Sequence, residues 1–260
     1  MKILVFVKQV PDTDDVKIDP KTGNLKREGV QSMMNPYDAN AVETALRLKE
    51  LHGGTVCAVS MGPPQAEAVL KKALAMGCDE SYLLSDRAFG GADTLATGYT
   101  LAQAAKNIGD YDLLIFGKCA TDAETAQTAP IVAQLLGLPQ ATLVRSVEIT
   151  DGWAFCERDL GDRVQRVKVN LPAMLSVTAE INQPRYPHPV NINGCLSKPR
   201  YVWSAADGFD TAKTGVKGSP SINKRIFEPE KRSTETTYFS GAPSEAAKAF
   251  VDALEAEHFI

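Results

Sequence analysis

The pattern of a strand, a loop and a helix is clearest in the stretch Tyr111-Asp-Leu-Leu-Ile-Phe-Gly-Lys-Cys-Ala-Thr-Asp-Ala-Glu-Thr-Ala-Gln-Thr-Ala-Pro130. Residues 113–116 are a continuous apolar run, typical of a strand buried on both faces of a parallel sheet. Gly117 ends the run, and Pro130 opens a helical pattern that continues to Leu136. The polar loop between them leads into a helix N-terminus, whose free N–H groups and dipole favour phosphate. An ordinary strand-to-helix connection would look the same.

Length and composition limit the classes of protein to consider. The chain has 260 residues, of which 44% are hydrophobic and 23% charged, which suits one large α/β domain or one domain with an appendage. A formal charge of −4 disfavours general binding to nucleic acid or anionic membranes. We expect neither a signal peptide nor membrane insertion, because the apolar runs are too short. The five cysteines form no C-x-x-C pair, which indicates free thiols, a reducing cytoplasm and no metal framework.

The alternation of strands and helices recurs before this stretch. Further strands are predicted at residues 3–7, 55–60 and 81–84, and two short polar strands at residues 16–19 and 24–27. Asn35-Pro36-Tyr37-Asp38 predicts a helix start, with Asn35 as N-cap and Asp38 completing the capping arrangement. Asp93 is expected to cap a helix that runs to about Ile108.

This order predicts a Rossmann-like twisted parallel sheet with right-handed crossovers and helices on both faces. Ligands of such sheets bind beyond the carboxyl ends of the strands. The loops after Val7, Ser60, Leu84 and Phe116 should therefore line one crevice. Because the chain has neither a G-x-G-x-x-G nor a G-x-x-x-x-G-K-[ST] motif, a nucleotide would be held by hydroxyls, amides and helix ends.

The hydrophobic period changes after Pro139. Residues 141–178 predict an antiparallel meander and a returning buried strand, with Asp151-Gly152 as the strongest hairpin signal of the chain. From residue 183 the chain is rich in proline, and only residues 244–257 recover helical spacing. We therefore predict an α/β domain at residues 1–186, and at residues 187–260 a C-terminal arm with a terminal helix that lies on another subunit.

Residues of proton-transfer chemistry are not grouped in this sequence. The three histidines lie in unlike contexts, and no G-x-S-x-G elbow is present, which suggests that a cofactor carries the reaction. The most informative polar group is Asp93-Thr94-Leu-Ala-Thr97, because both hydroxyls would lie on one face of a first helical turn and could bind pyrophosphate. Gly90 and Gly91 would let the backbone come close, although a plain N-cap and turn would also explain the pattern.

Six stretches occur together in the order and spacing of one family. They are Val7-Lys-Gln-Val-Pro11, Asn35-Pro-Tyr-Asp38, Met61-Gly-Pro-Pro64, Gly91-Ala-Asp-Thr94, residues 122–127 and Asn182-Gln-Pro-Arg-Tyr186. Over nearly its whole length the chain resembles the small (beta) subunit of the electron-transferring flavoproteins. The resemblance implies an adenine-nucleotide-hydrolase-like fold and an obligate alpha subunit that carries an FAD. The beta subunit holds AMP in the plain members, and a second FAD, reduced by NADH, in the electron-bifurcating members.

The resemblance also implies a set of site residues. The nucleotide would be bound by Phe6, Val7, Asn35, Tyr37, Asp38, Met61, Asp122, Thr125, Ala126, Gln127 and Thr128. A turn similar to that of the bifurcating branch would hold the diphosphate of the second FAD through Gly91, Ala92, Asp93, Thr94 and Thr97. The dehydrogenase-recognition segment would have its apolar anchor at Ile181, which could instead merely close the preceding strand. Cys119 and Ala123 depart from the family pattern, which has Gln and Gly there.

Four functions remain to be compared. The leading one is a redox carrier that binds FAD and passes electrons from NADH to a dehydrogenase and to a low-potential acceptor such as ferredoxin or flavodoxin. The second is a plain carrier that holds AMP and serves acyl-CoA-type dehydrogenases. An ATP-cleaving ligase or sulfur-inserting enzyme would need a Ser-Gly-Gly-x-Asp-Ser loop where Lys8-Gln-Val-Pro-Asp12 stands. A nucleotide-sensing stress protein would need a Gly-rich phosphate loop that this sequence lacks.

Overall fold

The computed structural model describes residues 1–12, 31–221 and 236–260. The chain divides into two units, Met1–Lys224 and Arg225–Ile260, and each is described by itself. The domain boundary that the sequence analysis expected after residue 186 therefore differs from the one in the structure. The two polar strands predicted at residues 16–19 and 24–27 lie outside the described residues.

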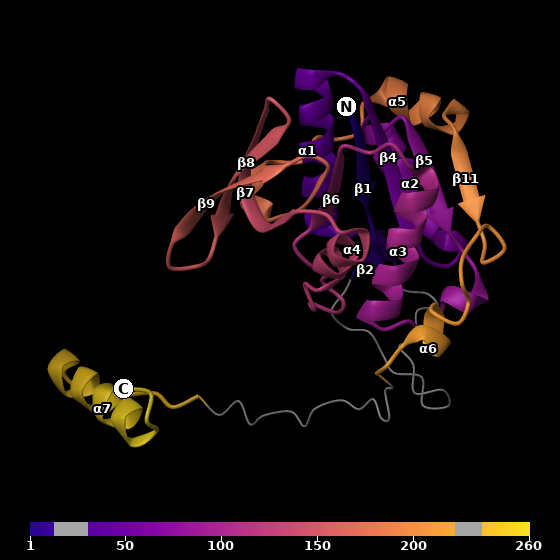
Figure 1. The fold of residues 1–260 in the computed structure, drawn as a ribbon. Coiled ribbons are helices and arrows are strands. Elements are labelled where there is room, and N and C mark those ends of the chain that lie inside the picture. The colour runs from indigo at the N-terminus through magenta and orange to yellow at the C-terminus, as the bar shows by residue number, and fades with distance from the viewer. Residues whose placement is uncertain (13–30, 222–235) are drawn as a thin grey trace. The chain divides into compact units, whose positions relative to one another are not determined.

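The first unit is built on a nine-stranded sheet with the order β11-β5-β4-β1-β6-β10-β7-β8-β9 (Figure 1). Its parallel strands are β1 (Lys2–Phe6), β4 (Thr55–Met61), β5 (Glu80–Leu84), β6 (Leu113–Gly117), β10 (Ala173–Val177) and β11 (Arg200–Trp203). A small antiparallel pair, β2 (Gln9–Pro11) and β3 (Ser32–Met34), occupies part of the predicted loop after β1. The predicted α/β fold with a mostly parallel sheet is confirmed.

Helices cover both faces of this sheet (Figure 1). One core contains Val5 and Ile115 from the sheet and packs against α1 (Pro36–His52) and α2 (Glu67–Met76). The opposite core contains Leu4 and Leu114 and packs against α3 (Thr94–Ile108) and α4 (Thr128–Leu136). Neighbouring residues of one strand thus face opposite cores, as the alternation of Cβ directions requires. Each fully buried Leu or Ile contributes roughly 1.5–3 kcal/mol of transfer free energy. The continuous apolar runs therefore stabilise the sheet in its position between the two layers of helices.

Two helix starts differ from their sequence predictions. Asn35 is the N-cap residue of α1, but its side chain makes no capping hydrogen bond, and the side chain of Asp38 is used elsewhere. Helix α4 begins at Thr128, two residues before Pro130. Pro130 still lies in the first turn, where N–H groups have no partner within the helix, so the proline is tolerated there.

The predicted meander is confirmed and is continuous with the main sheet. Strand β7 (Gln140–Thr150) pairs in parallel with β10 at its start and antiparallel with β8 (Trp153–Asp159) further on. Strand β9 (Val164–Asn170) completes it. The hairpin between β7 and β8 turns at Asp151 (φ 50°) and Gly152 (φ 75°). Positive φ at both central residues is the signature of a type I′ turn, which matches the twist of the strands.

Residues 187–221 were expected in an extended arm, but they pack on the domain itself. They contain α5 (Pro189–Gly194), β11 and α6 (Gly215–Gly218), and β11 adds to the edge of the sheet beside β5. Tyr201 of β11 stacks on Tyr82 of β5 with ring centroids 4.8 Å apart, and the buried Phe209 contacts Phe89. These aromatic contacts cover apolar surface at the edge of the sheet. The sequence did not predict them, because a segment this short shows no hydrophobic period.

The second unit contains the predicted terminal helix as α7 (Pro243–Ala256). Phe250 of α7 packs edge-on against Phe239 with centroids 5.7 Å apart, yet no residue of this helix is buried. None of the helices described for either unit is long and apolar enough to cross a membrane.

Candidate functional site

The carboxyl ends of β1 and β6 lie next to each other in the sheet and bring two predicted site loops together. Phe6 and Phe116 stack face to face there, with centroids 4.1 Å apart. Met61, at the end of β4, packs against the same apolar cluster. Val7 continues β1 and donates its N–H to the carbonyl of Val59 at 2.8 Å. These side chains form an apolar floor at the edge where ligands of such sheets bind.

Asp38 joins three elements beneath this edge. Its Oδ2 accepts a hydrogen bond from the backbone N–H of Lys8 at 2.7 Å, and the backbone N–H of Gly117 also donates to the carboxylate. A methyl group on Gly117 would overlap Asp38 Oδ1, so glycine is required for this close approach. Burial raises the pKa of Asp38 to about 7, against the effect of hydrogen bonds from Asn35 and from the two backbone groups. Asp38 therefore anchors loops instead of capping α1.

Asn35 is buried and holds the loop after β6. Its Nδ2 donates to the carbonyl of Cys119 at 2.8 Å, and its Oδ1 accepts from the N–H of Thr121 at 3.2 Å. Both amide groups are thus used across elements, which is why the predicted capping bond is not formed. Lys8 Nζ reaches Asp122 Oδ1 at 2.5 Å and ties the loop after β1 to the same loop.

Polar residues line the path from this loop into α4. Thr125, Ala126 and Gln127 are exposed, Asp122 and Thr128 are half-buried, and Ala126 has a positive φ of 53°. Gln127 occupies the N-cap position of α4 without a capping side-chain bond. The N–H groups of the first turn that no helical carbonyl accepts can therefore bind an anion. Lys118 adds positive charge nearby, since its Nζ lies 5.8 Å from the ring centroid of Tyr37.

The second group of predicted site residues lies at the start of α3. Asp93 caps this helix as predicted, because its Oδ1 accepts from the N–H groups of Leu95 and Ala96, each at 3.0 Å. Its Oδ2 accepts from the N–H and the hydroxyl of Ser221 at 3.1 and 2.8 Å. Burial acts to raise the pKa of Asp93, but these bonds hold it below its ordinary value. The carboxylate is charged and fully bonded.

Residues 214–221 cover the turn that carries Gly91, Ala92 and Thr94, and the sequence analysis missed them. Val216 lies against Gly91, the hydroxyl of Thr214 donates to the carbonyl of Ala88 at 3.1 Å, and the hydroxyl of Ser219 accepts from the N–H of Asp93 at 2.8 Å. The free donors that we expected at this turn are therefore fewer than the pattern suggested. The hydroxyls of the half-buried Thr94 and Thr97 remain candidates.

Helices α3 and α4 pack side by side, and this packing brings the two groups together. A methyl group on Gly98 of α3 would overlap the side chain of Ile131 of α4. A shallow groove of about 320 Å³ follows α4 from its first turn to its last and is lined by Leu95, Pro130, Ile131, Gln134, Leu135 and Gln140. The starts of the two helices thus lie side by side, although none of the predicted site residues lines this groove.

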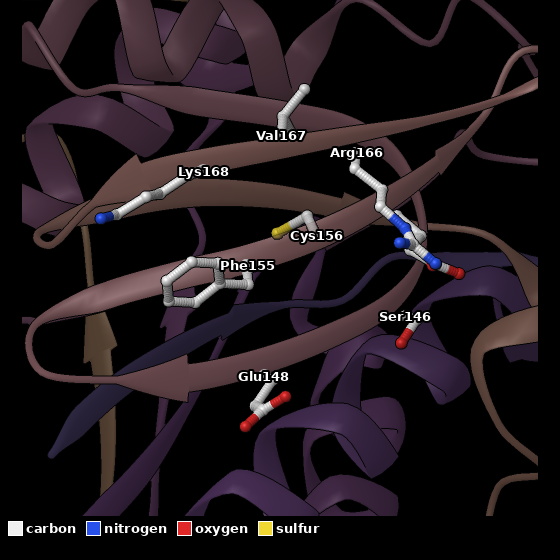
Figure 2. Close-up of a pocket in the computed structure, with 8 residues that line it drawn as sticks. Ser146, Glu148, Phe155, Cys156, Arg166, Val167 and Lys168 are labelled. Carbon is white, nitrogen blue, oxygen red and sulfur yellow. The ribbon is translucent and has the colours of Figure 1, made fainter.

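A second depression, of about 330 Å³, lies on the meander (Figure 2). Glu148, Phe155, Arg166 and Lys168 line it together with Ser146, Cys156, Glu157 and Val167. Lys168 Nζ lies 4.0 Å from the ring centroid of Trp153 and 5.2 Å from that of Phe155, so its charge is held against aromatic faces. The lining mixes both charge signs and none of the predicted site residues is in it. No group of three or more metal-ligating side chains occurs in the described parts of the chain.

Ile181, the predicted docking anchor, lies in a short 3-10 turn (Ala179–Ile181) directly after β10. It is partly buried and packs against the core on the α1 side. The docking role of Ile181 stays a prediction, and the part of its side chain that the core does not cover is the surface it would present.

The family assignment follows from comparison with known proteins. A family model described as "Electron transfer flavoprotein domain" matches residues 22–207, which is more than two thirds of the chain. The chain belongs to the electron transfer flavoprotein family.

Curated relatives match the chain along its full length. It is 43% identical over 262 residues to the caffeyl-CoA reductase-Etf complex subunit CarD of Acetobacterium woodii, and the match covers 100% of both chains. It is 44% identical over 264 residues to the electron transfer flavoprotein subunit beta of Thermoanaerobacterium thermosaccharolyticum, again with 100% of both chains covered. It is 40% identical over 268 residues to protein FixA of Azorhizobium caulinodans, across 100% of this chain and 94% of the relative. The chain is thus a beta-type subunit that takes part in electron transfer with an alpha subunit.

The residues present fit a bound nucleotide. Ser60, the residue before Met61, is 1% exposed, and its Oγ has no hydrogen-bond partner among the residues that the structure describes. A buried hydroxyl without a partner is costly, and a polar group of a bound ligand or a water molecule would satisfy it. The uncapped start of α4 and the polar loop before it suit a phosphate. A serine inside an apolar run at the carboxyl end of a strand was the sequence signal for Ser60.

Proposed function

We propose that this chain is the beta subunit of a bifurcating electron transfer flavoprotein and holds an FAD at the carboxyl edge of its sheet. NADH would reduce this flavin, and electrons would pass to a flavin dehydrogenase and to ferredoxin or flavodoxin. The observation that carries the proposal is the close contact of Gly98 with Ile131, which places the starts of α3 and α4 side by side. A diphosphate needs more donors than one helix start supplies, and a second start lies beside the first.

Each residue group would have a separate task around the cofactor. The α4 start and residues 122–128 would hold one phosphate, and the hydroxyls of Thr94 and Thr97 the other. The stacked Phe6 and Phe116 would exclude water from the edge of the sheet. Asp38 and Asn35 would keep the loops after β1 and β6 in place. When bound, the flavin would supply the chemistry of accepting a hydride and releasing electrons singly.

The name of one relative supports this proposal. CarD is by name a subunit of a caffeyl-CoA reductase-Etf complex, which joins such a subunit to an enzyme acting on an acyl-CoA. We propose the same kind of assembly for this chain, with an alpha subunit and an acyl-CoA-type dehydrogenase. The free cysteines suit a cytoplasmic location of that assembly.

One observation favours the plain carrier that holds AMP. Asp93 and residues 214–221 already occupy several donors at the α3 start, whereas α4 has no capping side chain. A single phosphate could be held by α4 alone. The two functions therefore differ in whether the Thr94 and Thr97 hydroxyls contact a ligand.

Counting flavins in the heterodimer decides between them. We expect two flavins per heterodimer after co-expression with the alpha subunit, and one in a Thr94→Val, Thr97→Val double variant that also loses NADH oxidation. Two bonds to a charged diphosphate, at roughly 1.5–3 kcal/mol each, are enough to empty the site. Thr100→Val is the control, because the Thr100 hydroxyl is buried and donates to the carbonyl of Ala96 within α3. One FAD and one AMP in the unaltered heterodimer would establish the plain carrier instead.

A further inference from the structure

Residues 179–185, which we call the anchored segment, are bonded to α1 through two asparagines. Asn40 Nδ2 donates to the carbonyls of Ala179 and Asn182 at 3.3 and 2.8 Å. Asn182 Nδ2 donates back to the carbonyl of Asn40 at 3.1 Å and to Thr44 Oγ1 at 2.8 Å. Asn40 and Thr44 are buried. The bonds are reciprocal, so neither amide can rotate without breaking several of them.

Arg185 fixes the other end of the anchored segment to the same helix. Its Nε donates to Glu43 Oε2 at 2.7 Å and its Nη1 to Glu50 Oε1 at 2.5 Å. Its backbone N–H also donates to Glu43 Oε2 at 3.2 Å. Glu43 is 3% exposed and accepts a further bond from Arg47 at 2.6 Å. Burial alone would raise the pKa of Glu43, but the two arginines lower it, so this buried carboxylate is charged.

This network specifies geometry more than it adds stability. A buried ion pair is often no more stabilising than apolar side chains of the same size, because desolvation offsets the attraction. A planar guanidinium held by two carboxylates does fix its direction. Tyr186 follows at once and is 93% exposed, more than any other large apolar or aromatic side chain described. The hydrogen-bonded anchored segment is thus followed directly by Tyr186, whose side chain faces solvent.

We propose that Asn40, Glu43 and Thr44 are positioning residues for protein docking. They hold the anchored segment in its docking conformation before the dehydrogenase arrives, so that Ile181 and Tyr186 are presented without further ordering. Preorganisation of this kind lowers the entropy cost of association and leaves the electron-transfer step itself unchanged. The inference rests on the proposed function, which supplies a dehydrogenase partner, and on the resemblance that places the dehydrogenase-recognition segment at Ile181.

The test measures docking separately from electron transfer. Butyryl-CoA reduces butyryl-CoA dehydrogenase, which passes electrons to the heterodimer and on to a dye, while the heterodimer concentration is varied. We expect Glu43→Gln to raise the KM for the heterodimer roughly tenfold with kcat unchanged, since ordering costs are added to binding only. Arg185→Lys should be intermediate, because it keeps the charge and loses the guanidinium fork. Amide hydrogen exchange of residues 179–186 should become faster in both variants.

Controls separate this inference from the proposed function. Glu67→Gln removes a carboxylate that also bonds two cations, Lys71 and Arg200, but on the exposed face of α2, and it should leave KM unchanged. If Ile181→Ala and Tyr186→Ala do not change KM, the segment is not the docking site. If they raise KM and Glu43→Gln does not, the positioning role is wrong. Asn182→Ala gives the same comparison should Glu43→Gln fail to fold, as judged from melting temperature and flavin content.

Discussion

Buried polar side chains at the edge of the sheet are used for joining loops. Asn35 and Asp38 stand in a sequence pattern that predicts helix capping, yet each bonds to backbone groups at least 30 residues away in the sequence. A capping bond satisfies one N–H group at a helix end, whereas these bonds fix the loops after β1 and β6 together. At the residue scale, the site therefore depends on buried hydrogen bonds whose partners are distant in sequence.

Asp38→Asn should change how the stability of the protein depends on pH. The pKa of Asp38 is about 7 in the folded protein, against an ordinary value of 3.8. Between these values the folded state holds one more proton than the unfolded state, so the unfolding free energy falls as pH rises from about 4 to 7 and is then level. A pKa unit corresponds to about 1.4 kcal/mol, so the loss is on the order of 4 kcal/mol. The amide of the variant does not titrate, and denaturation at a series of pH values should show this slope only in the unaltered protein.

Asp86→Asn is the matched control with the opposite sign. Hydrogen bonds from the N–H groups of Ala88 and Ala205 lower the pKa of Asp86, so its contribution is present at neutral pH and lost on acidification. The difference between the unaltered protein and each variant should therefore slope in opposite directions. A difference for Asp38→Asn that stays constant from pH 4 to 7 would contradict the assigned protonation.

The close packing of α3 on α4 is the feature that matters at the scale of elements. Gly98 has no side chain, and this lets the two helices approach until their starts lie side by side. Glycine within a helix costs about 1 kcal/mol relative to alanine. The closer packing of the two helices offsets this cost, because a larger residue would separate them.

Gly98→Ala should destabilise the domain despite the higher helix propensity of alanine. The added methyl group would overlap the β-branched side chain of Ile131, which has little rotamer freedom in a helix. Overpacking typically costs about 1–3 kcal/mol, which exceeds the propensity gain of about 1 kcal/mol. Urea denaturation should thus show a lower unfolding free energy. In an Ile131→Ala background the same change should be neutral or stabilising, and destabilisation in both backgrounds would rule out this contact as the cause.

The molecule as a whole divides into an α/β unit and a C-terminal unit. Residues 187–221 belong to the first, because β11 and the segment over the α3 start pack on its sheet and helices. The second unit holds α7, which has no buried residue. Its exposed apolar side chains include Phe250, Val251, Phe259 and Ile260. We infer that this unit is the part of the expected arm that contacts the alpha subunit.

A chain that ends at Lys224 should fold and yet fail to form the heterodimer. It keeps every strand of the nine-stranded sheet, so circular dichroism and the melting temperature should remain close to those of the full chain. Exposed apolar residues of α7 would no longer be available for association, and size-exclusion chromatography with the alpha subunit should show separate proteins. Heterodimer formation by the shortened chain would contradict this assignment, as would loss of its fold.

The local sequence pattern was sufficient to predict most of the helices and strands. The apolar run in β6 predicts a doubly buried strand, because only such a strand tolerates apolar residues on both faces. Asp151-Gly152 predicts a tight hairpin, since few residues accept the positive φ values of its turn. The Asp93 cap and the parallel sheet follow in the same way from short-range chemistry. These features were determined by the sequence alone because their causes lie within a few residues.

Only the tertiary structure decided how distant segments are used. Strand β11 has four residues, too few to show a period, and it is held beside β5 by a parallel ladder and by stacking of Tyr201 on Tyr82. The covering of the α3 start by residues 214–221 and the bonds of Asn35 to the loop after β6 are likewise long-range. Hydrogen bonds and aromatic contacts of this kind depend on three-dimensional proximity, which hydrophobic periodicity does not encode. Most strands of the main sheet could therefore be predicted, whereas β11 and the partners of the buried polar side chains could not.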